Sequence, residues 1–377
     1  MEAYFDNSAT TMPCPQAVEA VTAAMTGAWG NPSSLHDKGL EADALLQTSR
    51  EAVAKKLFCS ADEILFTSGG TESNNTALIG AARAMRRSGN RIVSTAVEHP
   101  SVDETLSRLE TEGFEVIRLK VDKTGRISES DLFHAVTRNT VLISIMAVNN
   151  EVGTIQPVEA AKKAALAAGS PALIHCDGVQ VFGKLPVKPA AMGVDLMSIS
   201  SHKIHGPKGV GALYIRKGVR LSPRTYGGLQ EKQIRPGTEP MPAIAGFGAA
   251  AAALPDMKRE LAEITALRDY MVSRLAAMDG IVVNSPADAL PYITNISVLG
   301  RRSEPMLNFL SQKGVYVSGG SACSKGKKSK VLLAMGLEPA RLDSPLRISF
   351  SRHTTAQEID YLIDCLAEGQ RVIRGTR

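Results

Sequence analysis

Short apolar runs alternate with longer amphipathic segments over the first two thirds of the chain. The apolar runs cover residues 91–97, 115–121, 141–148, 172–177, 196–200 and 211–216. The run VLISIMAV (141–148) is apolar on both faces, which is typical of a strand covered by helices on each side. Intervening segments such as SVDETLSRLETEG and PVEAAKKAALAAG have helical spacing and end in glycine. The alternation predicts an α/β domain with a mostly parallel sheet.

The pattern changes near the proline-rich segment IRPGTEPMP (234–242), which is followed by an alanine-rich stretch. After Pro255, apolar residues recur at spacings of three and four and predict one helix of about 23 residues. These residues are Leu261, Ile264, Leu267, Met271, Leu275 and Met278. Later strands are expected in YITNISVL, GVYVSGG and PLRISFS. We therefore predict a large domain at 16–255 and a small domain formed by 1–15 and 256–377.

Composition narrows the class of protein. The 377 residues include 43 basic and 38 acidic side chains, so the net charge of +5 gives no sign of nucleic-acid binding. No apolar stretch approaches the roughly 20 residues that span a bilayer, and MEAYFDNSATT lacks the features of a signal peptide. The odd number of scattered cysteines favours neither a disulfide framework nor zinc. We therefore expect a protein of the reducing cytoplasm, with no membrane association and no metal.

One cysteine lies in an unusual setting, the segment GGSACSKGKKSK (319–330). Glycines before Cys323 and lysines after it are expected to expose the thiol and to favour thiolate. The residues alone leave three interpretations: a metal ligand, a basic loop that happens to contain cysteine, and a mobile nucleophile. The other four cysteines are expected to be packing residues.

Three motifs contain candidate catalytic chemistry. The segment EILFTSGGTESNN (63–75) predicts a strand, a glycine turn and a helix start, whose free amides suit a phosphate, although an ordinary capped turn fits as well. In HCDGVQ (175–180), Asp177 ends a buried strand and could pair with a protonated heterocyclic nitrogen or cap a helix. Lys203 in SISSHKIHGPKGVG follows a strand, where partial burial would suit Schiff-base chemistry. Together the three are the anchors of pyridoxal phosphate.

The chain resembles the cysteine desulfurases of the NifS/IscS type, which are fold-type I pyridoxal-phosphate enzymes of the class-V aminotransferase family. The resemblance runs nearly end to end. It rests on DNSATT, GNPSSLH, TSGGTESNN, EH (98–99), NNEVGTIQP, HCDGVQ, SSHKIHGPKGVG, GGLQEKQIRPGTEP, GSACS and RISFSRHTT. It implies a large domain with a mostly parallel sheet between helices and a smaller α+β domain.

The resemblance also implies roles for the matching residues around the cofactor ring. Lys203 would link to the cofactor aldehyde and then move protons, and Asp177 would keep the ring nitrogen protonated. Gln180 would hydrogen-bond the phenolic oxygen, and His99 would stack on the ring face. The residues expected to bind the phosphate are Gly70, Thr71, Ser200 and His202.

Further roles concern the substrate, the partner subunit and the sulfur. Thr238 would reach the phosphate of the neighbouring subunit's cofactor, which implies a homodimer. Arg347 would bind the substrate carboxylate with its planar fork, beside Asn150. Cys323 would attack the sulfur of the cysteine substrate, keep it as a persulfide and release alanine. The acceptor would be an iron–sulfur scaffold or a tRNA-thiolation enzyme, and the lysines after Cys323 could meet an acidic partner.

The sequence differs from the family pattern in two respects, and two alternative functions stay open. Gly70 and Gly178 stand where the family often has alanine, and the segment after Cys323 is shorter and more basic than usual. Another pyridoxal-phosphate enzyme, an aminotransferase or a selenocysteine lyase, would need Lys203 and Asp177 but not Cys323. A non-enzymatic RNA-binding module would use the lysines of 325–330, but the balanced charge and the 5% aromatic content argue against it.

Overall fold

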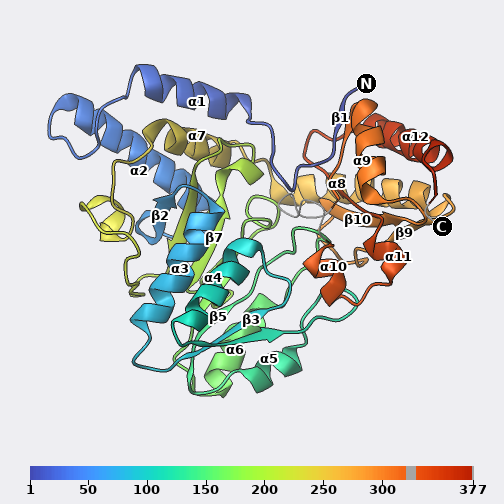
Figure 1. Ribbon diagram of the computed structural model, residues 1–377. Coiled ribbons are helices and arrows are strands. Elements are labelled where there is room, and N and C mark those ends of the chain that lie inside the picture. Colours follow the sequence, from blue (N-terminus) through green and yellow to red (C-terminus); the bar gives the residue numbers. More distant parts are fainter. Residues whose placement is uncertain (320–327, 376–377) are drawn as a thin grey trace.

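The computed structural model describes residues 1–319 and 328–375. Its centre is a seven-stranded sheet in the order β2-β8-β7-β6-β5-β3-β4 (Figure 1). The strands are β2 (Ile64–Thr67), β3 (Arg91–Thr95), β4 (Glu115–Leu119), β5 (Thr140–Ser144), β6 (Leu173–Asp177), β7 (Leu196–Ser200) and β8 (Gly211–Ile215). Strand β8 runs antiparallel to both of its neighbours, β2 and β7, and the other pairs of neighbouring strands in this sheet are parallel. The predicted α/β fold with a mostly parallel sheet is confirmed.

Helices cover both faces of this sheet. They are α1 (Pro15–Thr26), α2 (Asp37–Leu57), α3 (Gly70–Ala84), α4 (Pro100–Thr111), α5 (Glu129–Ala135), α6 (Val158–Ala167) and α7 (Met241–Ala252). Alternate residues of β2 enter different core clusters: Leu65 belongs to the cluster that contains residues of α3 and α4, while Ile64 and Phe66 belong to the cluster that contains residues of α2, α6 and α7. All five residues of β5 are buried, as expected for a strand covered on both faces.

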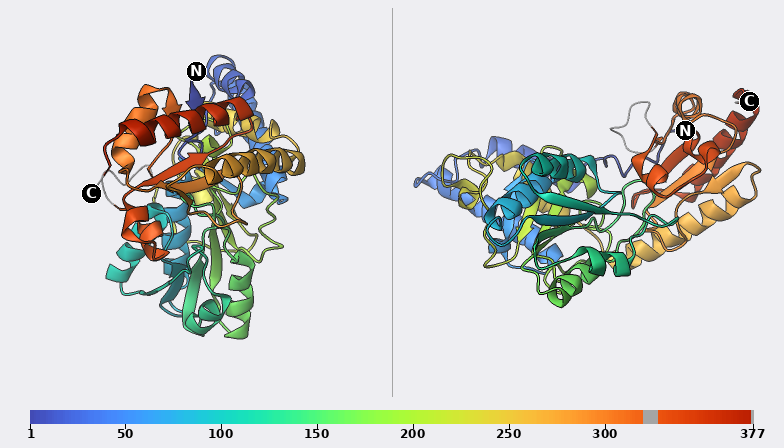
Figure 2. Two further views of the ribbon diagram at one scale, coloured as in Figure 1. Left: turned by 90° about the vertical axis from the view of Figure 1, so that its right-hand side faces the viewer. Right: turned by 60° about the horizontal axis from the view of Figure 1, so that its bottom comes forward.

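The C-terminal third forms a three-stranded antiparallel sheet in the order β12-β10-β9. Its strands are β9 (Ile281–Val283), β10 (Ile293–Val298) and β12 (Pro345–Ser349). The helices are α8 (Met257–Ala276), α9 (Ser303–Gln312), α10 (Lys330–Ala334), α11 (Pro339–Leu342) and α12 (Ala356–Val372). The expected long helix is α8, which has 20 residues. Figure 2 shows α8 and α12 beside this sheet, away from α1 and α2.

The N-terminal segment joins the C-terminal part of the fold. Strand β1 (Ala3–Tyr4) pairs in parallel with β11 (Val315–Tyr316), and Asp6 bridges to Ser349 of β12. The segment then runs to the edge of the large sheet, where the Thr11 hydroxyl donates to the His202 carbonyl at 2.9 Å. The predicted domain division at residues 16 and 255 stays a prediction. Within residues 1–319 and 328–375, no helix is both long and apolar enough to cross a membrane.

Candidate active site

A cavity of about 280 Å³ lies at the carboxyl ends of β6 and β7. Parallel strands bring their carboxyl ends to one edge, which is where open α/β sheets bind ligands. Ten residues that we predicted from the sequence line it: Gly70, Thr71, His99, Asn150, Asp177, Gln180, Ser200, His202, Lys203 and Arg347. Ser8, Ala9, Asn74 and Ser101 line it as well, and no role was predicted for them.

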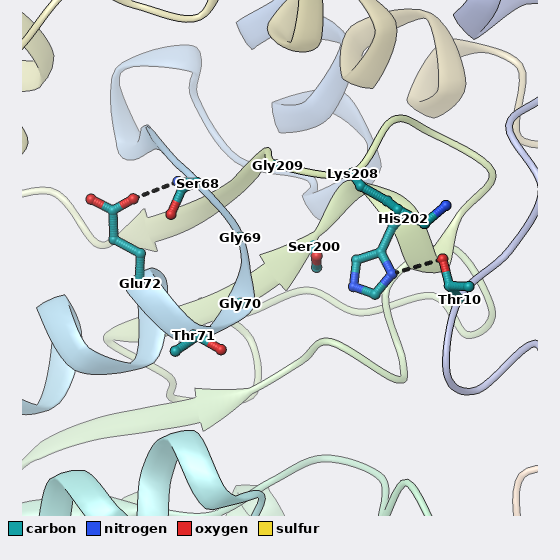
Figure 3. Close-up of a pocket in the computed structure, with 10 residues that line it drawn as sticks. All are labelled: Thr10, Ser68, Gly69, Gly70, Thr71, Glu72, Ser200, His202, Lys208 and Gly209. Carbon is teal, nitrogen blue, oxygen red and sulfur yellow. Dashed lines mark hydrogen bonds between the residues drawn. The ribbon is translucent and has the colours of Figure 1, made fainter. Parts of the chain in front are cut away.

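A second hollow of about 370 Å³ continues from this cavity over the start of α3 (Figure 3). Gly70, Thr71, Ser200 and His202 line both. Within the described chain, the Ser200 hydroxyl is buried without a hydrogen-bond partner, so a donor is available there. The unsatisfied amides at the start of α3, a helix of 15 residues, add to it. This end of the cavity fits a phosphate group.

His202 closes the other side of the phosphate end. Its Nδ1 lies 3.2 Å from the Thr10 hydroxyl, as Figure 3 shows. Burial, and then the charge of Lys203, lowers the pKa of His202 to about 4. These shifts favour the neutral imidazole, which can meet a ligand of this hollow as a hydrogen-bonding group.

The two glycines that depart from the family pattern have local explanations. A Cβ on Gly70 would come within 2.7 Å of Val179 Cγ2, and a Cβ on Gly178 would come within 2.9 Å of Met197 Cγ. Real Cβ atoms do not approach other atoms so closely. The side chains of Val179 and Met197 thus occupy the space that a larger residue at either position would need.

Asp177 is held in a defined orientation at the floor of the cavity. Its Oδ2 accepts a hydrogen bond from Asn74 Nδ2 at 2.7 Å, and its Oδ1 accepts one from the backbone N–H of Val179 at 3.1 Å. Both bonds fix the direction in which the carboxylate points. Asn74 lies in the motif TESNN, one turn into α3 from Thr71. Its position on the same helix face as Thr71 is the signal by which it could have been found.

A chain of hydrogen bonds leads from Asp177 to His99. Asn74 Nδ2 also donates to Ser101 Oγ at 2.8 Å, and Ser101 Oγ lies 2.8 Å from His99 Nδ1. The backbone N–H of Ser101 donates to the same nitrogen at 3.1 Å. His99 Nδ1 is therefore an acceptor, and the proton of the neutral ring belongs on Nε2. Burial lowers the pKa of His99 although Asp177 opposes the shift, so the neutral ring is favoured.

The N-terminal segment holds the amine of Lys203. Lys203, in the 3-10 turn Ser201–Lys203 after β7, donates from Nζ to the carbonyl of Ser8 and, at 2.8 Å, to that of Ala9. Gln180 Nε2 donates to the same Ser8 carbonyl at 3.0 Å. The sequence motif DNSATT is thus part of the site, and it contributes through backbone oxygens that every residue type has.

Arg347, in the middle of β12, reaches the cavity from the small sheet. The residue is only 1% exposed. Its Nη2 donates to Asp6 Oδ1 at 2.7 Å, and its Nη1 donates to the Asn150 carbonyl at 3.0 Å. Its Nε is buried, with no hydrogen-bond partner in the part of the chain that the structure describes. A guanidinium has five N–H donors, so three remain for a carboxylate.

Two predicted site residues are not placed in this cavity. Thr238 is exposed and lines neither hollow, and its expected contact with a neighbouring subunit stays a prediction. The turn before it, Gln230–Gln233, is held by Glu231, which pairs with Arg50 at 2.6 Å. Cys323 lies outside the described residues, so its role also stays a prediction.

The side chains present fit pyridoxal phosphate. The hollow over α3 offers the Ser200 hydroxyl and backbone amides for the phosphate, Asp177 offers a fixed carboxylate for the ring nitrogen, and Lys203 offers an amine for the aldehyde. These three groups line one continuous space. The donors left on Arg347 would suit the carboxylate of an amino acid.

Comparison with known proteins agrees with this chemistry. The family model for aminotransferase class-V matches residues 3–362. A NifS/IcsS protein homolog of Lactobacillus delbrueckii subsp. bulgaricus is 44% identical over 97% of this chain and 96% of its own. A cysteine desulfurase IscS of Dictyoglomus turgidum is 40% identical, with 100% of this chain and 95% of its own covered.

Solved structures agree with the fold. A NifS-like protein superposes with a TM-score of 0.92 at 37% identity, and the match covers 99% of each chain. A NifS-like protein from Rickettsia africae superposes with a TM-score of 0.87 at 30% identity, over 99% of this chain and 100% of its own. The resemblance inferred from the motifs is confirmed: this chain belongs to the class-V aminotransferase family, within its NifS/IscS-like group.

Proposed function

We propose that this protein is a pyridoxal-phosphate-dependent cysteine desulfurase, which converts L-cysteine to L-alanine and passes the sulfur to Cys323. The observation that carries the proposal is the convergence of Lys203, Asp177 and Arg347 on one cavity. Lys203 would bind the cofactor aldehyde, Asp177 the ring nitrogen and Arg347 the substrate carboxylate. Relatives with the name cysteine desulfurase match nearly the full length of the chain, which supports the same activity here.

The residues around the cofactor divide the work of binding and orientation. Bound pyridoxal phosphate supplies an electron sink for an amino-acid substrate. Asp177 would place its carboxylate beside a protonated ring nitrogen, and Asn74 and the Val179 N–H hold that carboxylate in a fixed orientation. The phosphate end uses Ser200, His202, Thr71 and the N-terminus of α3. Gln180 offers an N–H of its amide to the ring oxygen.

Two side chains handle protons. Lys203 would hold the cofactor aldehyde, and its amine would move a proton at the substrate. His99 is fixed through Nδ1 by Ser101, so its ring orientation is set; the ring would stack over the cofactor, and its Nε2–H would be the group available to donate. Arg347 fixes the substrate by its carboxylate, with Asn150 beside it.

The sulfur step is assigned to Cys323 on the sequence alone. The thiolate sulfur of Cys323 forms a bond with the substrate sulfur, the carbon–sulfur bond of the substrate breaks, and alanine leaves after a proton is added. The outer sulfur of the Cys323 persulfide is then transferred to an acceptor protein, an iron–sulfur scaffold or a tRNA-thiolation enzyme. We place the enzyme in the cytoplasm as a homodimer in which Thr238 binds the phosphate of the partner subunit's cofactor.

The test is to measure alanine and sulfide formed from L-cysteine by the wild type and by Cys323→Ser, with a thiol reductant present to release the persulfide sulfur as sulfide. Both products from the wild type, and neither from a Cys323→Ser protein that keeps its yellow colour, support the proposal. Normal turnover by Cys323→Ser would contradict it and would favour another pyridoxal-phosphate reaction. Cys59→Ser is a matched control, because burial raises the pKa of that thiol to about 12, which makes it a poor nucleophile.

A further inference from the structure

Lys184 is a buried lysine behind the candidate active site, one turn after Gln180. The residue is 6% exposed, and its Nζ donates to Gln180 Oε1 at 3.2 Å. Among residues 1–319 and 328–375, no carboxylate oxygen lies within 4 Å of this amine. It does not line the cavity itself. A buried amine without an ion pair is costly, so its presence calls for an explanation other than packing.

The contact with Gln180 decides which way the amide of that residue points. Lys184 occupies Oε1, and the Ser8 carbonyl accepts from Nε2 at 3.0 Å. A flipped amide would set its NH₂ group against the lysine amine and its oxygen against the Ser8 carbonyl. The amide oxygen and the Ser8 carbonyl would then face each other with no donor between them, and the ammonium form of Lys184 would offer the NH₂ group no acceptor. Lys184 and Ser8 therefore select one orientation, and the second N–H of Nε2 stays available to a ligand of the cavity.

The surroundings of Lys184 hold its amine in place without pairing it to a charge. The amine lies 5.5 Å from the centre of the Tyr292 ring, and the Tyr292 hydroxyl donates to Glu260 Oε1 at 2.8 Å. Burial lowers the pKa of Lys184 to about 7; Lys203 and Arg347 add to this shift, and Glu260 opposes it. The neutral amine and the ammonium both carry N–H groups, so the bond to Gln180 Oε1 is possible in either state.

We infer that Lys184 is a positioning residue that holds the Gln180 amide with an N–H toward the cofactor cavity, and that it acts on cofactor binding through Gln180. The inference rests on the proposed function, because it takes pyridoxal phosphate as the ligand. It assigns a role to a lysine that touches neither cofactor nor substrate. A purely structural lysine at this place would act on the cofactor independently of Gln180.

The experiment is a double-mutant cycle read out as cofactor affinity. The holoenzyme, Lys184→Met, Gln180→Ala and the double variant are dialysed against a series of pyridoxal phosphate concentrations, and retained cofactor is measured by its visible absorbance. We expect Lys184→Met to raise the Kd about tenfold in the wild-type background, the size of one lost hydrogen bond. In the Gln180→Ala background we expect less than about a twofold change.

Two more variants separate the possible causes. Lys184→Gln keeps a side-chain donor without the charge, and we expect it to bind the cofactor more tightly than Lys184→Met. Lys56→Met is the matched control: its amine donates to the Leu254 carbonyl at 3.3 Å and lines neither hollow, so the Kd should not change. Lys184→Met should also resist urea at least as well as the wild type, because an apolar chain replaces a buried amine.

Several results would overturn the inference. One is an equal rise in Kd on Lys184→Met in both backgrounds, and another is no rise in either. A Lys184→Met protein that fails to fold would show that the lysine is structural, which also overturns it. Failure of the proposed function gives a different result, since the wild type itself would then retain no pyridoxal phosphate.

Discussion

Replacement of Arg347 by alanine should weaken the binding of the substrate carboxylate far more than it disturbs the fold. The guanidinium already donates to Asp6 and to the Asn150 carbonyl, at 2.7 and 3.0 Å. Three N–H groups remain, and one of them, on Nε, is buried without a partner among the described residues. A substrate carboxylate that binds these groups would form a charge-assisted pair.

The size of the effect follows from the burial of Arg347. Loss of one member of a buried, hydrogen-bonded charge pair costs about 2–5 kcal/mol. The upper end applies when the group left behind cannot be hydrated. The Asp6 side chain is 22% exposed, so water can reach it in the variant and limit the cost on that side. We therefore expect a loss of about 3 kcal/mol, which corresponds to a rise of roughly 150-fold in the KM for L-cysteine.

The assay is the initial rate of alanine formation at a series of L-cysteine concentrations. Arg347→Lys should fall between the wild type and Arg347→Ala, because an ammonium keeps the charge but loses the planar fork. Arg352→Ala is the control, since among the described residues that side chain donates only to the Ala253 carbonyl, at 3.4 Å, and it does not line the cavity. Retained cofactor absorbance shows that the site is intact. A KM within about twofold of the wild type in Arg347→Ala would refute the reasoning.

Three further predictions concern groups in or behind the cavity. Lys203→Ala should lose the yellow absorbance of the lysine-linked cofactor in a visible spectrum; a normal spectrum would place that link on another lysine. Asp177→Asn keeps the shape of the carboxylate but not its charge, so kcat for alanine formation should fall by at least about 100-fold with unchanged circular dichroism, and an unchanged kcat would remove Asp177 from this role. Burial lowers the pKa of Lys184 from 10.5 to about 7, so the unfolded chain binds more protons than the folded chain between these pH values. The buried lysine therefore lowers the free energy of unfolding by its full amount below about pH 7, and this loss of stability fades as the pH rises toward the unfolded pKa. Lys184→Met should accordingly raise the urea midpoint most near pH 6 and least near pH 10; the same gain at both pH values would contradict this.

Local patterns predicted most of the central sheet but not where each strand ends. The run at 196–200 matches β7, residue for residue. The run at 141–148 is longer than β5, which ends at Ser144, and Met146 and Val148 line the cavity instead. Apolar residues are needed both in a buried strand and in the wall of a cavity, so composition cannot mark the change. Nor does an apolar run show strand direction, and β8 proved antiparallel to both neighbours.

The residues of the site likewise include some that the sequence predicted and some that it did not. Asp177, Lys203 and the glycine turn before α3 were predicted because each combines an unusual side chain with the end of a predicted strand. Asn74 and Ser101, which link Asp177 to His99, were not predicted. Asparagine and serine are common in helices and turns for local reasons, so their types alone gave no reason to choose them.

The sequence by itself determined which chemical groups this protein has, their local elements and the family to which they belong. Tertiary structure alone decided which groups meet. Arg347 pairs with Asp6 across 341 positions of the chain, and Lys203 donates to the carbonyls of Ser8 and Ala9. The physical reason is that such contacts depend on how two sheets and the N-terminal segment pack together. Backbone carbonyls are the same in every residue, so only their place in the fold makes these two part of the site.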